Sequence, residues 1–209
     1  MAGARLEIIS RNRRGSMLVV QSDIRSIRRG FRRLGRKVTN EAVRKSLNQA
    51  GRKVMTRAKR EIAGHRNLKI SEVGRKLRFR PAKGFRLAPH IEAKGRPISL
   101  MKLKTTPRQL KKGVRVRTQK GKPFTLLEGA FIATMRGRHG VQKGGGHVGV
   151  FERRGKARLP IREYTLPSIA HTLVNEVVSA RLEAFADEQI DLRLKANLNR
   201  QLARLPGAR

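Results

Sequence analysis

The sequence predicts an α+β protein with basic N-terminal helices, a mostly antiparallel β-sheet and a long C-terminal helix. Apolar residues recur every three or four positions over residues 22–64, and every three to five positions over residues 167–205, as on one face of a helix. Between these regions, residues 77–164 hold short apolar clusters separated by glycines and prolines, which is typical of strands. We expect residues 1–209 to form a single domain, because a chain of that length can bury its own core.

The N-terminal region begins with two short apolar patches within residues 1–22, which predict a β-hairpin. From Ser22 the spacing becomes helical, and it ends near Gly64, a residue type that often terminates helices. The pattern fits either one long helix with a kink within residues 35–40 or two helices that meet there. Residues 70–77 then predict a short helical turn.

The β-rich region is centred on two apolar segments, Phe124 to Thr134 and Val148 to Phe151, which we expect to be core strands. A glycine-rich, basic loop over residues 136–147 would join them as a long hairpin. Before them, residues 114–118 alternate valine with arginine. Such alternation places one face of a strand on a core and leaves the other for solvent or a partner.

The C-terminal helix is expected to start after Pro167, with Ser168 near its N-terminal end. Its spacing allows one break. Five of the fourteen acidic residues lie in it, so its charge is mixed. We expect its first half to pack on the sheet and its second half to reach a neighbouring subunit.

The charge balance is the main functional signal. The chain has 51 Lys and Arg against 14 Asp and Glu, a formal net charge of +37, so a free subunit would repel its copies and bind polyanions. We therefore expect a nucleic acid or an acidic protein surface as partner. The candidate contact residues are Arg28, Arg29, Arg32, Arg33 and Arg36 in the helical region, Arg115 and Arg117 in the alternating segment, and Arg136, Arg138 and Lys143 in the glycine-rich loop.

Each of these groups has a plainer interpretation. The arginines of the helical region could form a solvated helix face, although few glutamates are present to offset the repulsion between like charges. Arg115 and Arg117 could lie on an exposed sheet face, and the glycine-rich loop could be a connection only. Aromatic residues make up 4% of the chain, too few for the base-stacking platforms of single-strand binders.

Other functional classes lack a signature. There is no cysteine for a disulfide, a thiolate nucleophile or a thiolate zinc site, and no apolar run long enough to cross a membrane. Residues 144–149 spell a GxGxxG pattern, but the segment that follows is β-like, so no nucleotide site is expected. His139 and His147 have Glu152 as their only close carboxylate. We expect no catalytic residue, cofactor or metal, and synthesis in the cytoplasm.

The segments of residues 129–135, 149–153 and 155–163, followed by Pro167 and Ser168, together resemble the bacteriophage minor tail protein Z family, the tail completion proteins of long-tailed phages. The likeness covers roughly residues 35–190, and it includes residues 47–53 of the basic helical region. The motif residues, which the resemblance implies to be structural, are Gly129, Ala130, Phe131, Ile132 and Ala133 in one strand, Phe151 in the next, and Arg158, Leu159, Pro160 and Ile161. This chain departs from the family pattern in having an unusually long glycine-rich insertion over residues 139–147, between the two motif strands.

The resemblance implies a structural virion protein of the tail or neck, made in the host cytoplasm, with a fold similar to neck and tail-terminator proteins. It would complete the tail at the head-proximal end and help join tail to head around the DNA channel. The implied partners are the tail terminator, tail tube and connector, further copies in a homo-oligomeric ring, and double-stranded DNA bound without sequence preference. The family carries no catalytic residues.

Two other functions fit the composition. A general basic nucleic-acid-binding protein, such as a ribosomal or nucleoid component, would have the same charge balance. It should purify with RNA or chromosomal DNA, whereas a tail protein should purify with tail tubes. A basic nuclease or toxin would need a metal-dependent activity that no residues here indicate.

Overall fold

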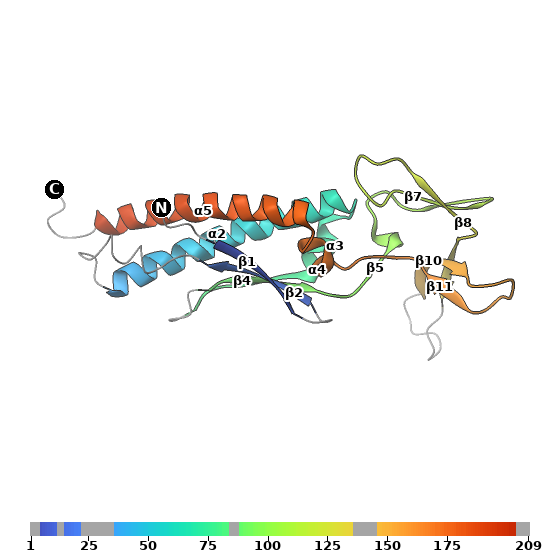
Figure 1. Cartoon of the computed structure of the whole chain (residues 1–209), viewed down its shortest axis with the longest axis horizontal. Coiled ribbons are helices and arrows are strands. Elements are labelled where there is room, and N and C mark those ends of the chain that lie inside the picture. The colour runs from blue at the N-terminus through green and yellow to red at the C-terminus, as the bar shows by residue number, and fades with distance from the viewer. Residues whose placement is uncertain (1–4, 12–14, 22–35, 84–87, 136–145, 204–209) are drawn as a thin grey trace.

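The computed structural model describes residues 5–11, 15–21, 36–83, 88–135 and 146–203, with side chains described from residue 40 onward. Figure 1 shows an elongated molecule. Two long helices and a four-stranded sheet form one part, which we call the helical body. Small sheets built from residues 108–163 form the other part, which we call the distal lobe.

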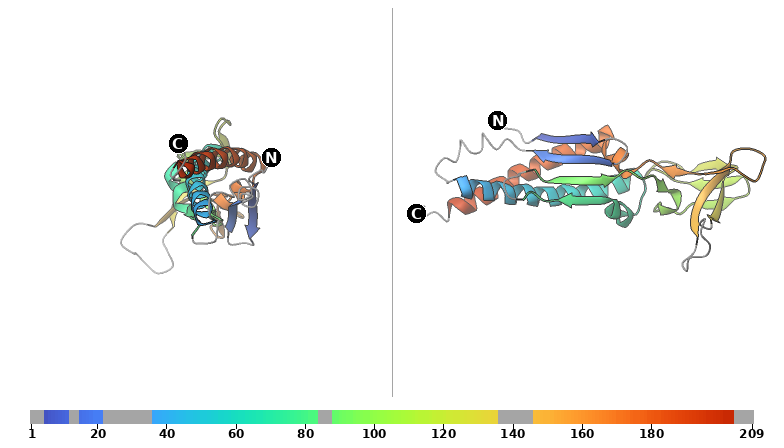
Figure 2. Two further views of the ribbon diagram at one scale, coloured as in Figure 1. Left: turned by 90° about the vertical axis from the view of Figure 1, so that its left-hand side faces the viewer. Right: turned by 90° about the horizontal axis from the view of Figure 1, so that it is seen from below.

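The helical body contains an antiparallel pair of helices, α2 (Arg36–His65) and α5 (Glu176–Leu202), that covers one face of a four-stranded antiparallel sheet (Figure 2). The strand order is β1-β2-β4-β3. The strands are β1 (Arg5–Arg11), β2 (Gly15–Gln21), β3 (Leu77–Arg80) and β4 (His90–Lys94). The short helices α3 (Ile70–Lys76) and α4 (Ile169–Leu173) close the end of the body next to the distal lobe.

The helix pair forms because α2 and α5 each carry an apolar stripe at helical spacing. On α2 the fully buried residues are Val43, Leu47, Ala50, Val54, Ala58 and Ile62, and on α5 they are Val178, Leu182, Ala186 and Ile190. A buried polar contact fixes their register, because the Asn197 amide nitrogen donates to Ser46 Oγ at 2.9 Å and to Gln49 Oε1 at 3.1 Å. The helix predicted to end near Gly64 is confirmed.

The N-terminal hairpin is also confirmed, with β1 and β2 paired from Arg5 opposite Gln21 to Arg11 opposite Gly15. The helix predicted over residues 22–35 lies outside the described residues. From Arg36 onward α2 is continuous. The hairpin does not stand alone, since β2 pairs with β4.

The α+β class and the antiparallel pairing are confirmed, but the strands form four small sheets rather than the one sheet expected from residues 77–164. Breaks at Pro97, Pro107 and Gly129 separate them, because proline cannot donate to a ladder and Gly129 turns the chain with φ of 68°. The smallest sheet pairs β5 (Ile98–Ser99) with β12 (Thr165–Leu166). In sequence, β5 is followed by the 3₁₀ turn η1 (Leu100–Lys102).

The distal lobe holds two three-stranded sheets. One has the order β6-β7-β8 and the other β11-β10-β9. Their strands are β6 (Arg108–Leu110), β7 (Gly113–Val116), β8 (Thr125–Glu128), β9 (Phe131–Met135), β10 (His147–Arg153) and β11 (Ile161–Glu163). Gln109 joins the sheets: its amide nitrogen donates to Gly113 O at 3.1 Å, and its Oε1 accepts from the Ile132 N–H at 2.8 Å.

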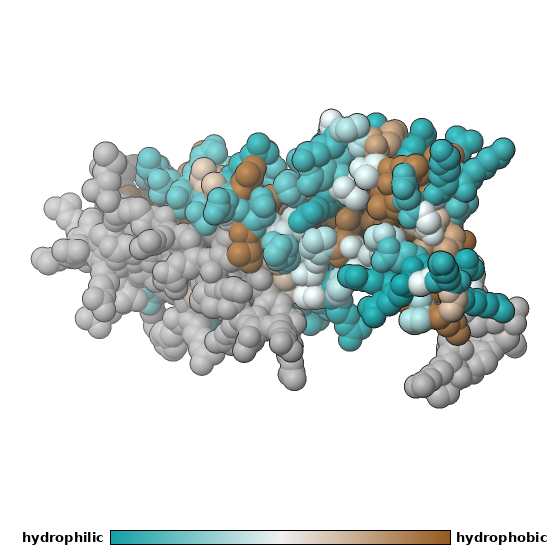
Figure 3. All heavy atoms as spheres, turned by 45° about the vertical axis from the view of Figure 1, so that its right-hand side comes forward, coloured by the Kyte–Doolittle hydropathy of each residue, from teal (hydrophilic) through white to brown (hydrophobic). Residues whose placement is uncertain are grey.

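The predicted hairpin of β9 and β10 is confirmed, but the extent of the core strands is corrected. The apolar segment from Phe124 to Thr134 is two strands of different sheets, and Phe124 and Leu126 are each 38% exposed. Val148 is exposed as well. The reason is that each small sheet is covered on one face only, so alternate apolar residues face outward. Figure 3 shows such apolar side chains (brown) between hydrophilic ones (teal).

The C-terminal helix has the one break that its spacing allows, between α4 and α5 at residues 174–175. Ser168 caps α4 by accepting a hydrogen bond from the His171 N–H at 3.1 Å. The expected packing of its first half on the sheet is confirmed only for α4, which contacts β2 and β4. α5 packs instead along α2 and beside β1, because the apolar stripes of the two long helices face each other.

Tyr164, the only tyrosine of a chain without tryptophan, offers a spectroscopic test of the distal lobe. Its hydroxyl donates a hydrogen bond to Glu152, and that bond, with burial, raises the pKa of Tyr164 above its ordinary value of 10.0. We expect the phenolate absorbance of the native protein to titrate with a midpoint above 10.0. The associated stability is present below the ordinary pKa and is lost as the pH rises through the native one.

Glu152→Gln should bring this midpoint down, because the carboxylate acceptor is removed. Glu163→Gln is the matched control, since Glu163 contacts His147 and not Tyr164. Circular dichroism at each pH would verify that the protein is still folded. A native midpoint at or below 10.0 would contradict the hydrogen bond.

Candidate polyanion-binding cleft

The outward face of α2 is cationic because its apolar stripe points toward the core. Exposed along it are Lys45, Arg52, Lys53, Arg57 and Arg60. Within the described part of the chain, Arg57 is the only one of these in an ion pair, with Glu61. Like charges three and four residues apart on a helix destabilise it slightly. A bound polyanion would remove that cost.

At the C-terminal end of this face, three segments surround a cleft of about 600 Å³. They are the last turns of α2, the first turns of α5 and the turn of residues 119–122 between β7 and β8. The lining residues are Arg57, Arg60, Glu61, Gly64, His65, Gln119, Lys120, Gly121, Lys122, Val177, Val178 and Arg181. Five of them are Lys or Arg and one is acidic, so the cleft is strongly positive.

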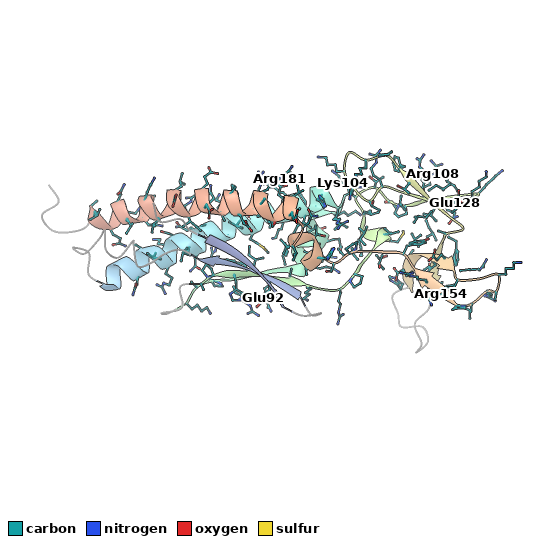
Figure 4. All side chains as sticks on the ribbon, in the orientation of Figure 1. Glu92, Lys104, Arg108, Glu128, Arg154 and Arg181 are labelled. Carbon is teal, nitrogen blue, oxygen red and sulfur yellow. The ribbon has the colours of Figure 1, made fainter. Side chains whose placement is uncertain are left out.

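The acidic residue of the cleft organises two of its arginines. Glu61 is half-buried, with one carboxylate oxygen 2.8 Å from Arg57 Nη2 and the other 3.5 Å from Arg181 Nη1. The Arg57 guanidinium also lies 5.6 Å from the centre of the Phe185 ring. Figure 4 shows Arg181 near the start of α5, at the junction with the distal lobe. These guanidinium groups are therefore held in place before any ligand arrives.

The remaining cations of the cleft are available to contact a ligand. Arg60, Lys120 and Lys122 are exposed and have no ion pair with any described residue. Five cations around one carboxylate leave excess positive charge at the site. A phosphate-bearing polyanion satisfies this requirement, because arginine and lysine both bind phosphate oxygens through charge-assisted hydrogen bonds.

The pKa of His65 depends on its burial and on the positive charges of the cleft. Burial lowers the pKa of His65 below its ordinary value of 6.5. The positive charges of Arg66, Arg181 and Lys122 lower that pKa further. Both effects favour the neutral imidazole, so the cleft gains little charge from it at pH 7.

Of the predicted contact residues whose side chains are described, Arg115 and Arg117 do not line this cleft. Arg115 and Arg117 lie on or next to β7, over the Phe124 ring. Arg36 is the first residue of α2. The others lie outside the described residues, namely Arg28, Arg29, Arg32, Arg33, Arg136, Arg138 and Lys143.

Arg57 and Arg60 lie within the basic helical region predicted over residues 22–64, but sequence reasoning missed Lys120, Lys122 and Arg181. The available signal was the Lys-Gly-Lys-Pro turn of residues 120–123, which follows directly on the valine–arginine alternation. Arg181 carried no signal of its own, because only the antiparallel packing of α5 on α2 brings it beside Glu61.

The motif residues of the distal lobe occupy structural positions. Gly129 makes the turn between β8 and β9, Ala130 is buried, and Phe131 pairs with Phe151 at a ring-centre distance of 6.3 Å. Ile132 and Ala133 continue β9. The remaining segment is only partly a strand: Arg158, Leu159 and Pro160 form an exposed connection, and Ile161 begins β11.

The described residues hold no group of three His, Asp or Glu side chains that could bind a metal ion. His147 instead lies 2.8 Å from Glu163 through its Nε2. None of the described helices is both long and apolar enough to span a membrane.

A family model described as prophage minor tail protein Z (GPZ) matches residues 24–206, which is most of the chain. The chain belongs to this family. The match confirms the resemblance carried by the motifs of residues 129–161, and it gives this member of the minor tail protein Z family a structural role in a phage tail, as a virion component. Neither curated proteins nor solved structures show a match.

Proposed function

We propose that this minor tail protein Z family member completes the phage tail at its head-proximal end and helps join the tail to the head. In this role it forms a homo-oligomeric ring around the DNA channel, in contact with the tail terminator, the tail tube and the connector. It acts as a structural part of the neck and catalyses no reaction. Membership in a minor tail protein family supports the tail part of this proposal.

The observation that carries the DNA contact is the cationic cleft together with the basic face of α2. A ring of subunits, each with a net charge of +37, would create a positive lumen suited to the passage of DNA. Lysine and arginine contacts to phosphates need no base recognition and are independent of sequence. The outward-facing cations of α2 and the turn of residues 119–122 would supply these contacts.

The test is a triple charge reversal in the cleft, Arg60→Glu, Lys120→Glu and Lys122→Glu. All three side chains are exposed, so the fold should be retained. We expect weaker binding to double-stranded DNA of any sequence. The slope of log K against log salt concentration should fall by roughly 2.7, or about 0.9 for each lost phosphate contact. Fluorescence anisotropy at several salt concentrations measures both quantities.

The matched control reverses three exposed cations of the helical body, Lys83→Glu, Lys94→Glu and Arg96→Glu, which changes the net charge by the same amount. This variant should lose less DNA affinity, because its changes lie away from the cleft. Equal losses in both variants would show that only the total charge matters. DNA binding unchanged by the cleft variant would overturn the DNA contact.

The place in the virion needs a separate measurement. An antibody or gold label on this protein, viewed by electron microscopy, should mark the head-proximal end of the tail. Phages that lack the protein should yield heads and full-length tails that are not joined. A label at the distal tip or along the whole tube would refute the proposed position.

A further inference from the structure

The outer face of the β6-β7-β8 sheet combines exposed apolar residues with arginines. Antiparallel pairing places Arg108 opposite Arg115 and Arg115 opposite Leu126, so these three side chains share one face. Leu110 and Phe124 reach the same face by alternation along their strands. Leu110, Phe124 and Leu126 are all exposed. We call this surface the arginine sheet face.

The arginines of this face lie over its aromatic residue. The guanidinium carbon of Arg115 is 4.4 Å from the centre of the Phe124 ring, and that of Arg117 is 4.1 Å. Two cation–π contacts orient the guanidinium groups and occupy the ring, which is then not free to stack on a base. Arg108, Arg115 and Arg117 have no ion pair with any described residue. Exposed apolar groups with arginine and an aromatic residue are typical of protein interfaces.

A surface of complementary chemistry lies on α5. Ala184, Glu188, Asp191 and Leu192 are all exposed, and their spacing of four, three and one residues places them on one side of the helix, where the exposed cations Arg181 and Lys195 lie one turn before and one turn after them. Neither carboxylate has an ion pair in the described part of the chain. Nearby, burial raises the pKa of Asp187, and the charges of Asp191 and Glu183 raise it further. We call Ala184, Glu188, Asp191 and Leu192 the acidic helix face.

The two faces cannot meet within one molecule. The arginine sheet face lies in the distal lobe, and the acidic helix face lies midway along α5 in the helical body (Figure 1). Figure 4 shows Arg108 and Glu128 at the end of the molecule opposite to the C-terminal half of α5. A contact between them therefore needs two copies. Because it uses different surfaces on the two copies, it repeats head to tail and either closes into a ring or extends.

We infer that the acidic helix face of one copy docks on the arginine sheet face of the next. Glu188 and Asp191 would pair with Arg115 and Arg117, and Leu192 would contact Phe124, Leu126 and Leu110. This contact rests on the proposed function, because it specifies how the proposed ring is closed. It also explains how subunits with a charge of +37 approach one another, since opposite charges meet locally while the remaining cations face elsewhere.

The experiment is a charge swap on the full chain. Glu188→Arg with Asp191→Arg should make both faces basic, and Arg115→Glu with Arg117→Glu should make both acidic. Each double variant is expected to associate about 30-fold more weakly than the natural chain, or worse, in sedimentation at several concentrations. An equal mixture of the two variants should assemble again, because every contact then joins opposite charges. The quadruple variant should also assemble alone.

The control is Lys94→Glu with Arg96→Glu, which changes the net charge by the same amount as Arg115→Glu with Arg117→Glu, but on the helical body, and should leave association intact. Circular dichroism and thermal unfolding verify the fold of each variant. Association of the Arg115 and Arg117 variant at natural strength, or a mixture that stays dissociated, would overturn the contact. The contact would also be overturned by a variant that forms oligomers normally when purified but is no longer incorporated into tails. The altered face would then bind another tail protein rather than a second copy of this chain.

The same samples separate this contact from the proposed function. If the variants still form oligomers and a label still marks the head-proximal end, the contact is wrong and the proposed function stands. If the natural chain is a monomer and is found elsewhere in the virion, both are wrong.

Discussion

Asn67→Ala is expected to lower the free energy of unfolding by about 2–4 kcal/mol. Asn67 is buried and lies just after α2, where the chain turns toward α3. Its amide nitrogen donates to Arg117 O at 2.7 Å and to Thr105 Oγ1 at 3.3 Å, and its own carbonyl accepts from the Lys104 N–H at 2.7 Å. One residue thus ties the end of α2 to the segment before β6 and to the segment that follows β7.

The backbone of Asn67 adds to the expected loss. Its φ of 49° lies in the left-handed region, which asparagine tolerates better than alanine does. Asn67→Gly separates the two effects, because glycine accepts this backbone conformation but also lacks the amide. The glycine variant should therefore be about 1 kcal/mol more stable than the alanine variant, and both less stable than the natural chain. Urea unfolding followed by circular dichroism measures all three.

If alanine and glycine at position 67 gave equal stability, the left-handed backbone would be refuted. If both variants were within about 0.5 kcal/mol of the natural chain, the hydrogen bonds of Asn67 would be shown to contribute little. Limited proteolysis provides a second measurement. Cleavage between the helical body and the distal lobe should be faster in both variants, because Asn67 connects these two parts.

The elements that could be predicted are those whose pattern is long and local. α2 and α5 follow from helical spacing alone, and the N-terminal hairpin follows from two apolar patches around a polar turn. Gly129 interrupts the apolar segment of residues 124–134, but the apolar residues on either side of it predict one strand. Its residues are apolar on both sides because Phe124 and Leu126 belong to an exposed face, which no local pattern distinguishes from a buried one.

The sequence predicts that the protein binds a polyanion, but it does not predict which residues form the binding cleft. A net charge of +37 indicates a polyanionic partner, but it does not show which Lys and Arg side chains come together in one site. Arg57 and Glu61 are visible as an i,i+4 pair on a helix. Lys120 and Arg181 join them only because the β7–β8 turn and the start of α5 pack at the same end of α2. Such contacts depend on tertiary packing between residues far apart in the sequence.

Two leucines of α5 provide a test of which side of that helix belongs to the core. Leu182 is 0% exposed and packs in the core shared with α2, whereas Leu192 is 52% exposed. Leu182→Ala should lower the free energy of unfolding by about 2–5 kcal/mol, because it removes buried methyl groups and leaves a cavity. Leu192→Ala should change it by less than about 0.5 kcal/mol. Urea unfolding at a concentration where the chain is monomeric compares the two.

Leu192→Ala should act instead on association. If Leu192 contacts the arginine sheet face of another copy, its removal weakens the oligomer while the monomer remains as stable as before. Leu182→Ala gives the opposite result when oligomers are compared under conditions where the variant is folded. A loss of monomer stability in Leu192→Ala as large as that in Leu182→Ala would mean that both sides of α5 are covered within one chain. The acidic helix face would then be unable to receive a second copy.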